Sequence, residues 1–203
     1  MIFHHSVYAL DFVNRSLDGR QILLLQGPFV EGDSQKFNQA IRQIGRIDEI
    51  WFHSGGGSVV EGMAIGRKIR SLSLATRIPN DAKCYSICAF AFLGGMIREI
   101  EPRGDYGVHM FSAICQEEKR IALVNGITDI VKSKGNRGAA AIVDLLLQTE
   151  QSSARTAREQ ADYLLEMEVS LRLLFPNYET TCDKIHSLNR QELVSYNIVN
   201  TTR

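Results

Sequence analysis

The stretch of sequence that decides the fold is IWFHSGGGSVVEGMAIGRKIRSL, which covers residues 50–72. It begins with an apolar run, passes through three consecutive glycines, and ends in a segment whose apolar side chains recur at i, i+4 and i+7. A short apolar run bounded by turn residues is typical of a buried strand, and the recurring pattern is typical of one helix face. The stretch therefore predicts a strand over 47–52, a glycine turn, and a helix over 59–72.

The same alternation of strand and helix signals extends on both sides of this stretch. Short apolar strands joined by single helices are typical of parallel β-α-β units, so the sequence predicts an α/β fold. Beyond residue 111 the pattern is helical. The remaining signals predict strands over 21–25, 75–78, 96–100, 106–111 and 198–199, and helices over 33–44, 86–93, 116–134, 139–149 and 152–175 and from Asn189 onward.

Length and composition favour one globular domain. The chain has 203 residues, of which 44% are apolar and 23% are charged, close to the globular average. No linker or shift in composition interrupts it, so we expect a single domain over residues 1–203. Within it we expect a core over 20–111, a helical region over 112–188, and a C-terminal helix and strand over 189–203.

Charge and hydropathy exclude two classes of partner. Lys plus Arg and Asp plus Glu each number 23, so the formal net charge is zero, whereas nucleic-acid-binding proteins usually carry a basic excess. No run of about 18 apolar residues is present, so we expect no membrane span. The N-terminal residues lack the basic start and apolar run of a signal peptide. The sequence therefore predicts a cytoplasmic protein, or a periplasmic one if a signal or anchor has been removed.

Two of the four cysteines, Cys84 and Cys88, flank Ser86. Their spacing is not C-x-x-C and no second ligand pair accompanies them, so we expect neither a metal nor another cofactor. The simplest interpretation is a pair of buried thiols on one helix, because free cysteine behaves as a small apolar side chain. A disulfide between Cys84 and Cys88 is the alternative, and it would point to an oxidising compartment.

Three features could carry chemistry, and each also has an ordinary structural explanation. The glycines at 55–57 let the backbone approach a ligand at a helix N-terminus, but a plain tight turn has the same sequence. Ser86 lies at a predicted helix start, which suits an N-cap and also suits a nucleophile that benefits from the helix dipole. His109 lies in an apolar strand, as a core histidine or as a general base.

Taken together, the order of these features resembles the ClpP/crotonase superfamily, and within it the Clp protease proteolytic subunit. The resemblance is carried by FHSGGGSVVEGMAI over 52–65, by CYSICAF over 84–90, and by the pair Val108-His109. It covers residues 20–111 well and 185–200 faintly. The Cys-x-Ser-x-Cys form is similar to a ClpP-like branch described as periplasmic. The resemblance implies a spiral of β-β-α and β-α-β repeats with a helical C-terminal part.

The resemblance also implies the function of a serine peptidase that acts on a peptide or protein substrate without a cofactor. Ser86 would attack the scissile carbonyl, and His109 would take its proton and pass it to the leaving amine. The backbone N–H groups of Gly57 and Ile87 would form the oxyanion hole. The substrate would lie extended beside a sheet edge near the glycine turn.

The resemblance leaves the third catalytic residue open. The family's aspartate lies after a long helix and before the C-terminal helix, and Asp183 is the nearest acid in that position. Glu179 and Asp162 are alternatives, and so is a backbone carbonyl that would fix the tautomer of His109 without an acid. Lys83 could pair with the serine, although a surface lysine is the simpler interpretation.

Departures from the family pattern bear on assembly. Gly55 stands in place of a proline, Cys88 in place of a glycine, and Met-Phe at 110–111 in place of Gln-Pro. Residues 112–150 also differ from the family's handle region, so stacked heptameric rings and an ATPase unfoldase partner stay open. We expect a homo-oligomer, with the 152–175 helix as a candidate contact. Two other functions are weighed: a non-catalytic assembly or peptide-binding module, and a crotonase-like acyl-CoA enzyme.

Overall fold

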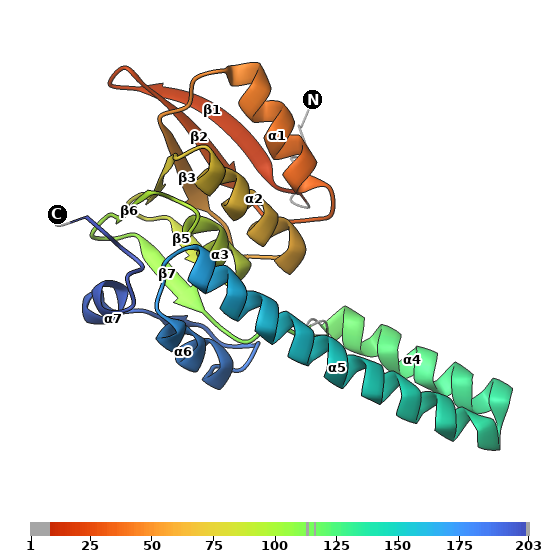
Figure 1. The fold of residues 1–203 in the computed structure, drawn as a ribbon. Helices are drawn as coiled ribbons and strands as arrows, with labels where there is room; N and C mark the ends of the chain where they lie inside the picture. The colour runs from red at the N-terminus through yellow and green to blue at the C-terminus, as the bar shows by residue number, and fades with distance from the viewer. Residues whose placement is uncertain (1–8, 113, 116, 202–203) are drawn as a thin grey trace. The chain divides into compact units, whose positions relative to one another are not determined.

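A computed structural model describes residues 9–112, 114–115 and 117–201 of the chain, and they form a mixed α/β structure (Figure 1). The α/β class predicted from the sequence is therefore confirmed. The described residues divide into two compact units. One contains the residues up to 110 together with those from 164 onward, and the other contains residues 111–163. The single-domain organisation stays a prediction.

The larger unit contains a five-stranded sheet in the order β1-β2-β3-β4-β6. β1 and β2 form an antiparallel hairpin, and every later pair of neighbours is parallel, as the β-α-β pattern predicts. β1 was not predicted, because most of its side chains are exposed and its apolar alternation is weak. The strands are β1 (Asp11–Leu17), β2 (Arg20–Gln26), β3 (Glu49–His53), β4 (Ala75–Ile78) and β6 (Ile97–Ile100).

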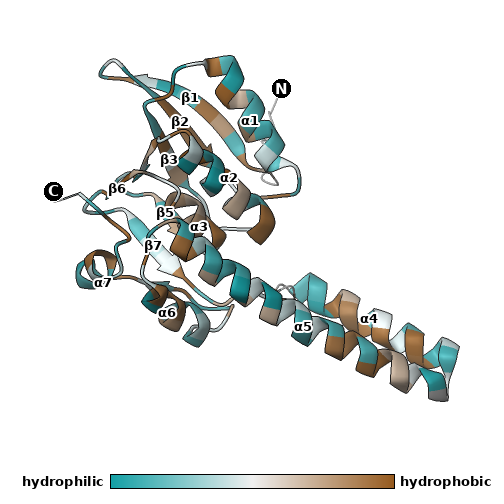
Figure 2. Cartoon of the chain, in the orientation of Figure 1, coloured by the Kyte–Doolittle hydropathy of each residue, from teal (hydrophilic) through white to brown (hydrophobic). Residues whose placement is uncertain are grey.

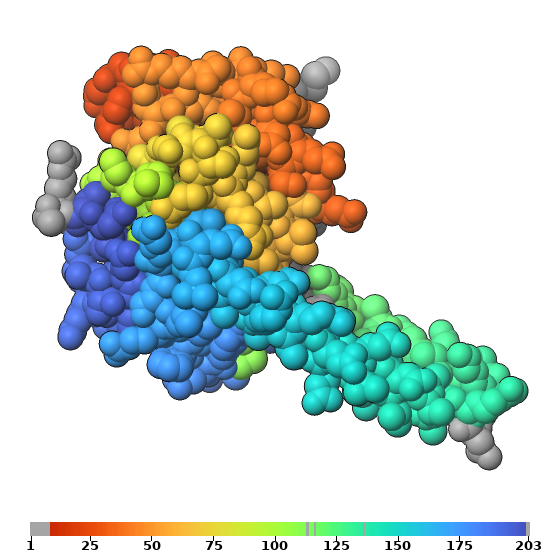
Figure 3. All heavy atoms as spheres, in the orientation of Figure 1, coloured from red at the N-terminus to blue at the C-terminus, as the bar shows by residue number. Residues whose placement is uncertain are grey.

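Two helices, α1 (Asp33–Ile44) and α2 (Val59–Ser71), lie on the same side of this sheet. The ring of Phe37 in α1 lies 6.0 Å from the ring of Phe12 in β1, and Ile69 of α2 is fully buried. Figure 3 shows α1 and α2 side by side on the surface. Burial of their apolar stripes holds both helices on the sheet, and it thereby fixes the turns that precede them.

A second sheet has three strands in the order β5-β7-β8. It meets the first sheet at the end of β3, where Ser54 forms a parallel bridge with Cys84. β3 pairs with β4 only over residues 49–51, so the glycine turn directly follows the point where the sheets diverge. Helix α3 (Ile87–Phe92) follows β5 and is completely buried. The strands of this sheet are β5 (Lys83–Tyr85), β7 (Asp105–Val108) and β8 (His186–Ser187).

The helices of the second half differ from their predicted boundaries. Those predicted over 139–149 and 152–175 are one helix, α5 (Asn136–Glu166), because residues 150–151 are good helix formers that leave no break. α5 ends where Glu168 adopts a φ of 56°. The other helices are α4 (Glu117–Lys134), the short 3-10 helix η1 (Leu171–Leu173), α6 (Leu174–Glu179) and α7 (Arg190–Ser195), while residue 116 lies outside the described residues.

Helix α7 begins with the predicted capping box, in which Asn189 and Glu192 each accept the other's backbone N–H through their side chains. The strand predicted over 198–199 is wrong, because the N–H of Ile198 bonds to the Leu193 carbonyl at 2.9 Å and closes the helix instead. In the described part of the chain, no helix is long and apolar enough to cross a membrane. Figure 2 shows hydrophilic as well as hydrophobic residues along both α4 and α5.

Candidate active site

The glycine turn after β3 is held by the side chain of Ser54. Its Oγ donates a hydrogen bond to the Gly27 carbonyl at 2.6 Å and accepts one from the Gly56 N–H at 3.1 Å. Gly56 and Gly57 have φ values of 106° and 141°, which side chains other than glycine rarely adopt. A Cβ on Gly57 would also lie 2.2 Å from the Phe29 carbonyl oxygen. The sequence therefore needs glycine at both positions.

Ser86 stands at the junction between β5 and α3 in a strained conformation. Its φ is 57° and its ψ is −127°, although non-glycine residues strongly prefer negative φ. Its N–H donates to the Gly107 carbonyl at 3.0 Å. α3 begins at Ile87 rather than at the predicted residue 86, and the Ser86 side chain makes no capping hydrogen bond to it. Ser86 thus occupies an N-cap position without capping the helix through its hydroxyl.

The glycine turn lies against the Ser86 side chain. A Cβ on Gly56 would lie 2.6 Å from the Cβ of Ser86 and 3.2 Å from its Oγ. α2 also approaches α3 closely, since a Cβ on Gly62 would lie 2.4 Å from Cγ1 of Ile87. Among the described residues, the N–H groups of Gly57 and Ile87 donate to no acceptor. Gly56 and Ser86 are in contact, and the two N–H groups belong to the residues that directly follow them in the sequence, Gly57 and Ile87.

Cys84 and Cys88 form a disulfide that spans Ser86, with their Cα atoms 5.1 Å apart. The interpretation as two buried thiols on one helix is wrong, because Cys84 lies in β5 and only Cys88 lies in α3. Both residues are fully buried. Cys115 and Cys182 are disulfide-bonded as well, so none of the four cysteines, all of them in the described part, is free. The disulfide weighed as the alternative is confirmed.

His109 lies one residue beyond the end of β7, and not inside a strand as the sequence predicted. β5 and β7 are parallel, with Tyr85 paired to Gly107, so Ser86 and His109 follow the ends of neighbouring strands. The Nδ1 of His109 lies 2.9 Å from the Met110 carbonyl oxygen. Because a carbonyl can only accept, this contact assigns the proton of a neutral ring to Nδ1. Nε2 is then free of a proton, which is the form that a general base needs.

The loop at 181–185, which carries Asp183, begins and ends beside the His109 segment. At its start the Thr180 carbonyl accepts a hydrogen bond from the Met110 N–H at 2.9 Å, and at its end β8 pairs with β7. Asp183 itself is exposed. In a triad, the acid would accept the hydrogen bond from Nδ1 of His109. Here Nδ1 contacts the Met110 carbonyl instead, as in the alternative in which a backbone carbonyl fixes the tautomer.

The other residues weighed from the sequence occupy ordinary positions. Glu179 is the last residue of α6, and Asp162 forms an i, i+4 ion pair with Arg158 at 2.6 Å on α5. Lys83 is exposed, and its Nζ lies 5.7 Å from the centroid of the Tyr85 ring. In the described structure the Ser86 hydroxyl and the His109 ring share no hydrogen bond.

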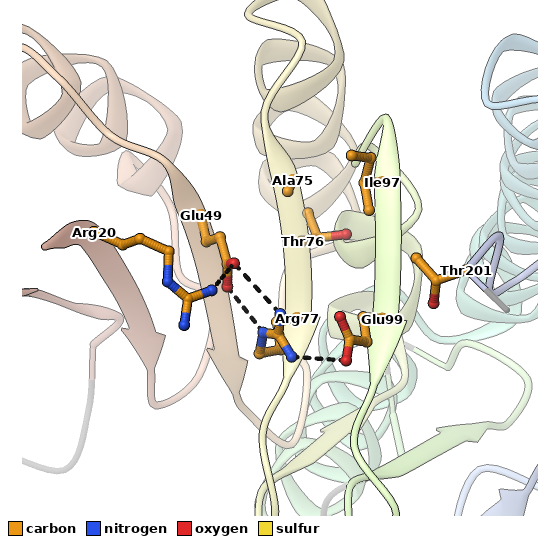
Figure 4. Close-up of a pocket in the computed structure, with 8 residues that line it drawn as sticks. All are labelled: Arg20, Glu49, Ala75, Thr76, Arg77, Ile97, Glu99 and Thr201. Atoms are coloured by element: carbon orange, nitrogen blue, oxygen red, sulfur yellow. Dashed lines mark hydrogen bonds and ion pairs between the residues drawn. The ribbon is translucent and has the colours of Figure 1, made fainter. Parts of the chain in front are cut away.

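Figure 4 shows a pocket over the five-stranded sheet that is lined by a network of ion pairs. Arg77 contacts Glu49 at 2.8 Å and Glu99 at 2.9 Å, and Arg20 contacts Glu49 at 2.6 Å. Burial alone would raise the pKa of Glu49, but hydrogen bonds from Arg77 and Trp51 outweigh it and hold that pKa below its ordinary range. The charges neutralise one another, and none of the described lining residues is a candidate catalytic residue, so we assign the network a structural role.

No protein-family model matches the chain, and no curated protein is significantly similar to it. Among the residues that the structure describes, no group of three or more His, Cys, Asp or Glu side chains is placed to hold a metal ion. Function is therefore inferred from the geometry around Ser86.

Proposed function

We propose that the chain is a ClpP-like serine peptidase with Ser86 as its nucleophile. The observation that carries the proposal is the backbone of Ser86, a non-glycine residue at a φ of 57° whose side chain caps nothing. Strained residues persist only where the surrounding structure over-determines them, and they cluster at active sites. A serine turned outward at a strand–helix junction presents its Oγ at the helix N-terminus, where developing negative charge is stabilised.

The proposed reaction is acyl transfer through an ester of Ser86. The Oγ attacks the scissile carbonyl while Nε2 of His109 takes its proton, and the protonated imidazole then gives that proton to the leaving amine. The N–H groups of Gly57 and Ile87 receive the oxyanion, and the loss of one such donor typically costs about 10²–10³ in rate. Water then hydrolyses the ester, with His109 again acting as the base.

The His109 ring needs a partner at Nδ1 that fixes its tautomer. The Met110 carbonyl supplies one at 2.9 Å. We keep Asp183 as the proposed acid because its loop runs beside His109, and because a carboxylate stabilises the imidazolium better than a carbonyl does. If Asp183 is the triad member, Asp183→Asn lowers kcat by about 10⁴-fold. A nearly unchanged kcat would assign the role to the carbonyl instead.

The proposed fold is the ClpP/crotonase spiral, which the meeting of two sheets at Ser54 and the close approach of α2 to α3 support. A peptide or protein substrate would bind extended near the glycine turn, where backbone groups make the hydrogen bonds. Recognition of this kind needs no net charge, in agreement with the neutral sequence.

A fluorophosphonate probe, which reacts with activated serine hydroxyls, tests the proposal directly. Wild type is expected to form an adduct on Ser86, located by peptide mass spectrometry, and Ser86→Ala is expected to form none. Ser58→Ala is the matched control, since Ser58 also stands directly before a helix, α2, and caps it. Equal labelling of Ser86→Ala, or no labelling of folded wild type, would overturn the proposal.

A non-catalytic peptide-binding module is the second candidate. It is favoured by one observation, the lack of a hydrogen bond between the Ser86 hydroxyl and the His109 ring in the described structure. Catalytic hydrogen bonds are often long in enzymes without substrate, so this observation weighs less than the strain at Ser86. Peptide binding without fluorophosphonate labelling would favour the module, and a thermal shift with acyl-CoA would favour a crotonase-like enzyme.

We also propose that the chain forms a homo-oligomer through the hairpin of α4 and α5. Six large apolar side chains of these two helices are about half exposed or more, and exposed apolar surface is a feature of protein interaction sites. Molar mass from light scattering is expected to exceed that of one chain, and Leu146→Glu/Leu147→Glu is expected to lower it, with Gln148→Glu as control. A monomeric wild type would contradict the proposal. The exposed side chains are Ile121, Val124, Val131, Val143, Leu146 and Leu147.

A further inference from the structure

The disulfide between Cys84 and Cys88 closes a ring around Ser86. Cys84 belongs to the strand before the junction and Cys88 to the first turn of the helix after it, and both side chains are completely buried. The disulfide thus ties together the two elements whose mutual direction sets the backbone angles of Ser86.

Non-covalent contacts also hold the junction. The Ser86 N–H bonds to the Gly107 carbonyl at 3.0 Å, and the Ser86 carbonyl accepts the N–H of Ala89 at 3.0 Å. β5 pairs with β7, and α3, which has only six residues and gains no capping bond from Ser86, is held by its complete burial. A residue at positive φ needs its surroundings to over-determine it, and the disulfide is the covalent part of these surroundings.

We propose that the Cys84–Cys88 disulfide positions Ser86, and that Ser86 is reactive only while this disulfide is intact. The inference rests on the proposed function, because it concerns the reactivity of the same serine. Reduction by a dithiol reagent transfers two electrons and two protons to the disulfide, breaks the S–S bond, and leaves two thiols. Thiol sulfurs cannot approach as closely as bonded ones. The strand and the helix then separate, and Ser86 relaxes to negative φ.

The relaxed junction would resemble that of Ser58, an ordinary N-cap with a φ of −66° and a hydroxyl directed at its own helix. If the Ser86 hydroxyl capped α3, it would point away from the substrate carbonyl that it has to attack. A misplacement of about 1 Å can lower the rate about 10²-fold. The chain would therefore work where disulfides persist. This favours the oxidising compartment weighed from the sequence over the cytoplasm.

The test compares Ser86 labelling in two redox states. The full chain carrying Cys115→Ser/Cys182→Ser retains only the Cys84–Cys88 pair, so dithiothreitol acts on this disulfide alone. Thiol alkylation and mass spectrometry establish that the pair is reduced. We expect the rate of fluorophosphonate labelling to fall about 10²-fold on reduction. The same background with Cys84→Ser/Cys88→Ser should label at this low rate in both conditions. Equal rates in the oxidised and the fully reduced protein would overturn the inference.

A second measurement does not depend on activity. Glycine tolerates positive φ, so Ser86→Gly removes the strain that the disulfide maintains at this position. In the same background we expect reduction to lower the denaturant midpoint of the Ser86→Gly variant more than that of the Ser86 parent, because only the parent recovers strain energy when the junction relaxes. Equal losses would overturn the inference. If neither redox state labels, the proposed function fails, and this comparison still decides whether the disulfide restrains the junction.

Discussion

Two strand-to-helix junctions of this molecule carry a serine directly before the helix and have opposite properties. The glycine turn separates Ser58 from the end of β3, whereas Ser86 directly follows β5. Ser58 has a φ of −66° and its Oγ accepts the N–H of Glu61 at 3.5 Å. Ser86 has a φ of 57° and its hydroxyl caps nothing. The same residue in the same place therefore stabilises one helix, while in the other it is held in a strained form with a hydroxyl available for chemistry.

The two helix N-termini differ in charge as well. The first turn of α2 contains Glu61, whereas the first turn of α3 contains no acidic residue. A helix N-terminus attracts negative charge, and at α3 no side chain of the first turn supplies it. A developing oxyanion could take that place. This difference between the two N-termini agrees with the role proposed for the Ser86 junction.

Among variants that test this difference between the two junctions, we expect Gly56→Ala to have the largest effect on the free energy of unfolding. Its new Cβ would lie 2.6 Å from the Cβ of Ser86, at a backbone φ of 106° that alanine avoids. We expect the free energy of unfolding to fall by about 3 kcal/mol. Gly55→Ala is the matched control, because its Cβ would meet nothing within 4 Å, and a change within about 0.5 kcal/mol is expected.

Urea titration of both variants, together with fluorophosphonate labelling, measures these effects. Gly56→Ala should lose labelling of Ser86 even where it remains folded, and Gly55→Ala should keep it. If Gly56→Ala retained wild-type stability and labelling, the glycine turn could not lie against Ser86 as the structure has it.

A smaller effect of opposite sign separates the two serines. Ser86→Gly relieves a positive φ, so we expect a gain of about 1 kcal/mol in the free energy of unfolding and complete loss of labelling. Ser58→Gly loses a cap and is expected to lose a few tenths of a kcal/mol, and Ser58→Ala about 1 kcal/mol, both with labelling retained. Chemical denaturation of the three variants and of wild type measures these differences. A destabilised Ser86→Gly would show that Ser86 carries no strain.

Most of the five-stranded sheet and its helices could be predicted from the sequence because each element has its own local signal. α1 ends where the sequence predicts it, before Gly45, and β4 has its predicted bounds, before Pro79. β1 and β5 lack such a signal, since β1 exposes most of its side chains and β5 has only three residues. The long helices failed at their ends, where the local pattern gives the least information, and α5 also contains a predicted break at 150–151 that the structure does not have.

The candidate site could be predicted in its residues but not in its geometry. Three glycines and the serine at residue 86 are local features that the sequence displays. Ser86 has its positive φ in contact with neighbours distant in sequence, Gly56 and Gly107, and no local pattern displays these contacts. A cysteine spacing of four fits two thiols on a helix as well as a bridge across a strand–helix turn, so the disulfide could not be chosen from the spacing alone.

The smallest expected effect concerns Glu61, the acid in the first turn of α2 at the Ser58 junction. Burial raises the pKa of Glu61, but its carboxylate accepts the N–H of Ser34 at 2.7 Å and of Gly32 at 3.1 Å, and these bonds hold the pKa below its ordinary value of 4.5. A carboxyl with a lowered folded pKa adds stability above its unfolded value, and the protein loses that stability as the pH falls through the folded pKa. Glu61→Gln should therefore cost about 1 kcal/mol near neutral pH and progressively less below pH 4.5. Denaturation curves across that range measure the difference, and a gap independent of pH would contradict the assignment. At neutral pH the labelling of Ser86 should not change in Glu61→Gln, because Glu61 accepts its backbone hydrogen bonds from Gly32 and Ser34 and not from the junction at Ser86.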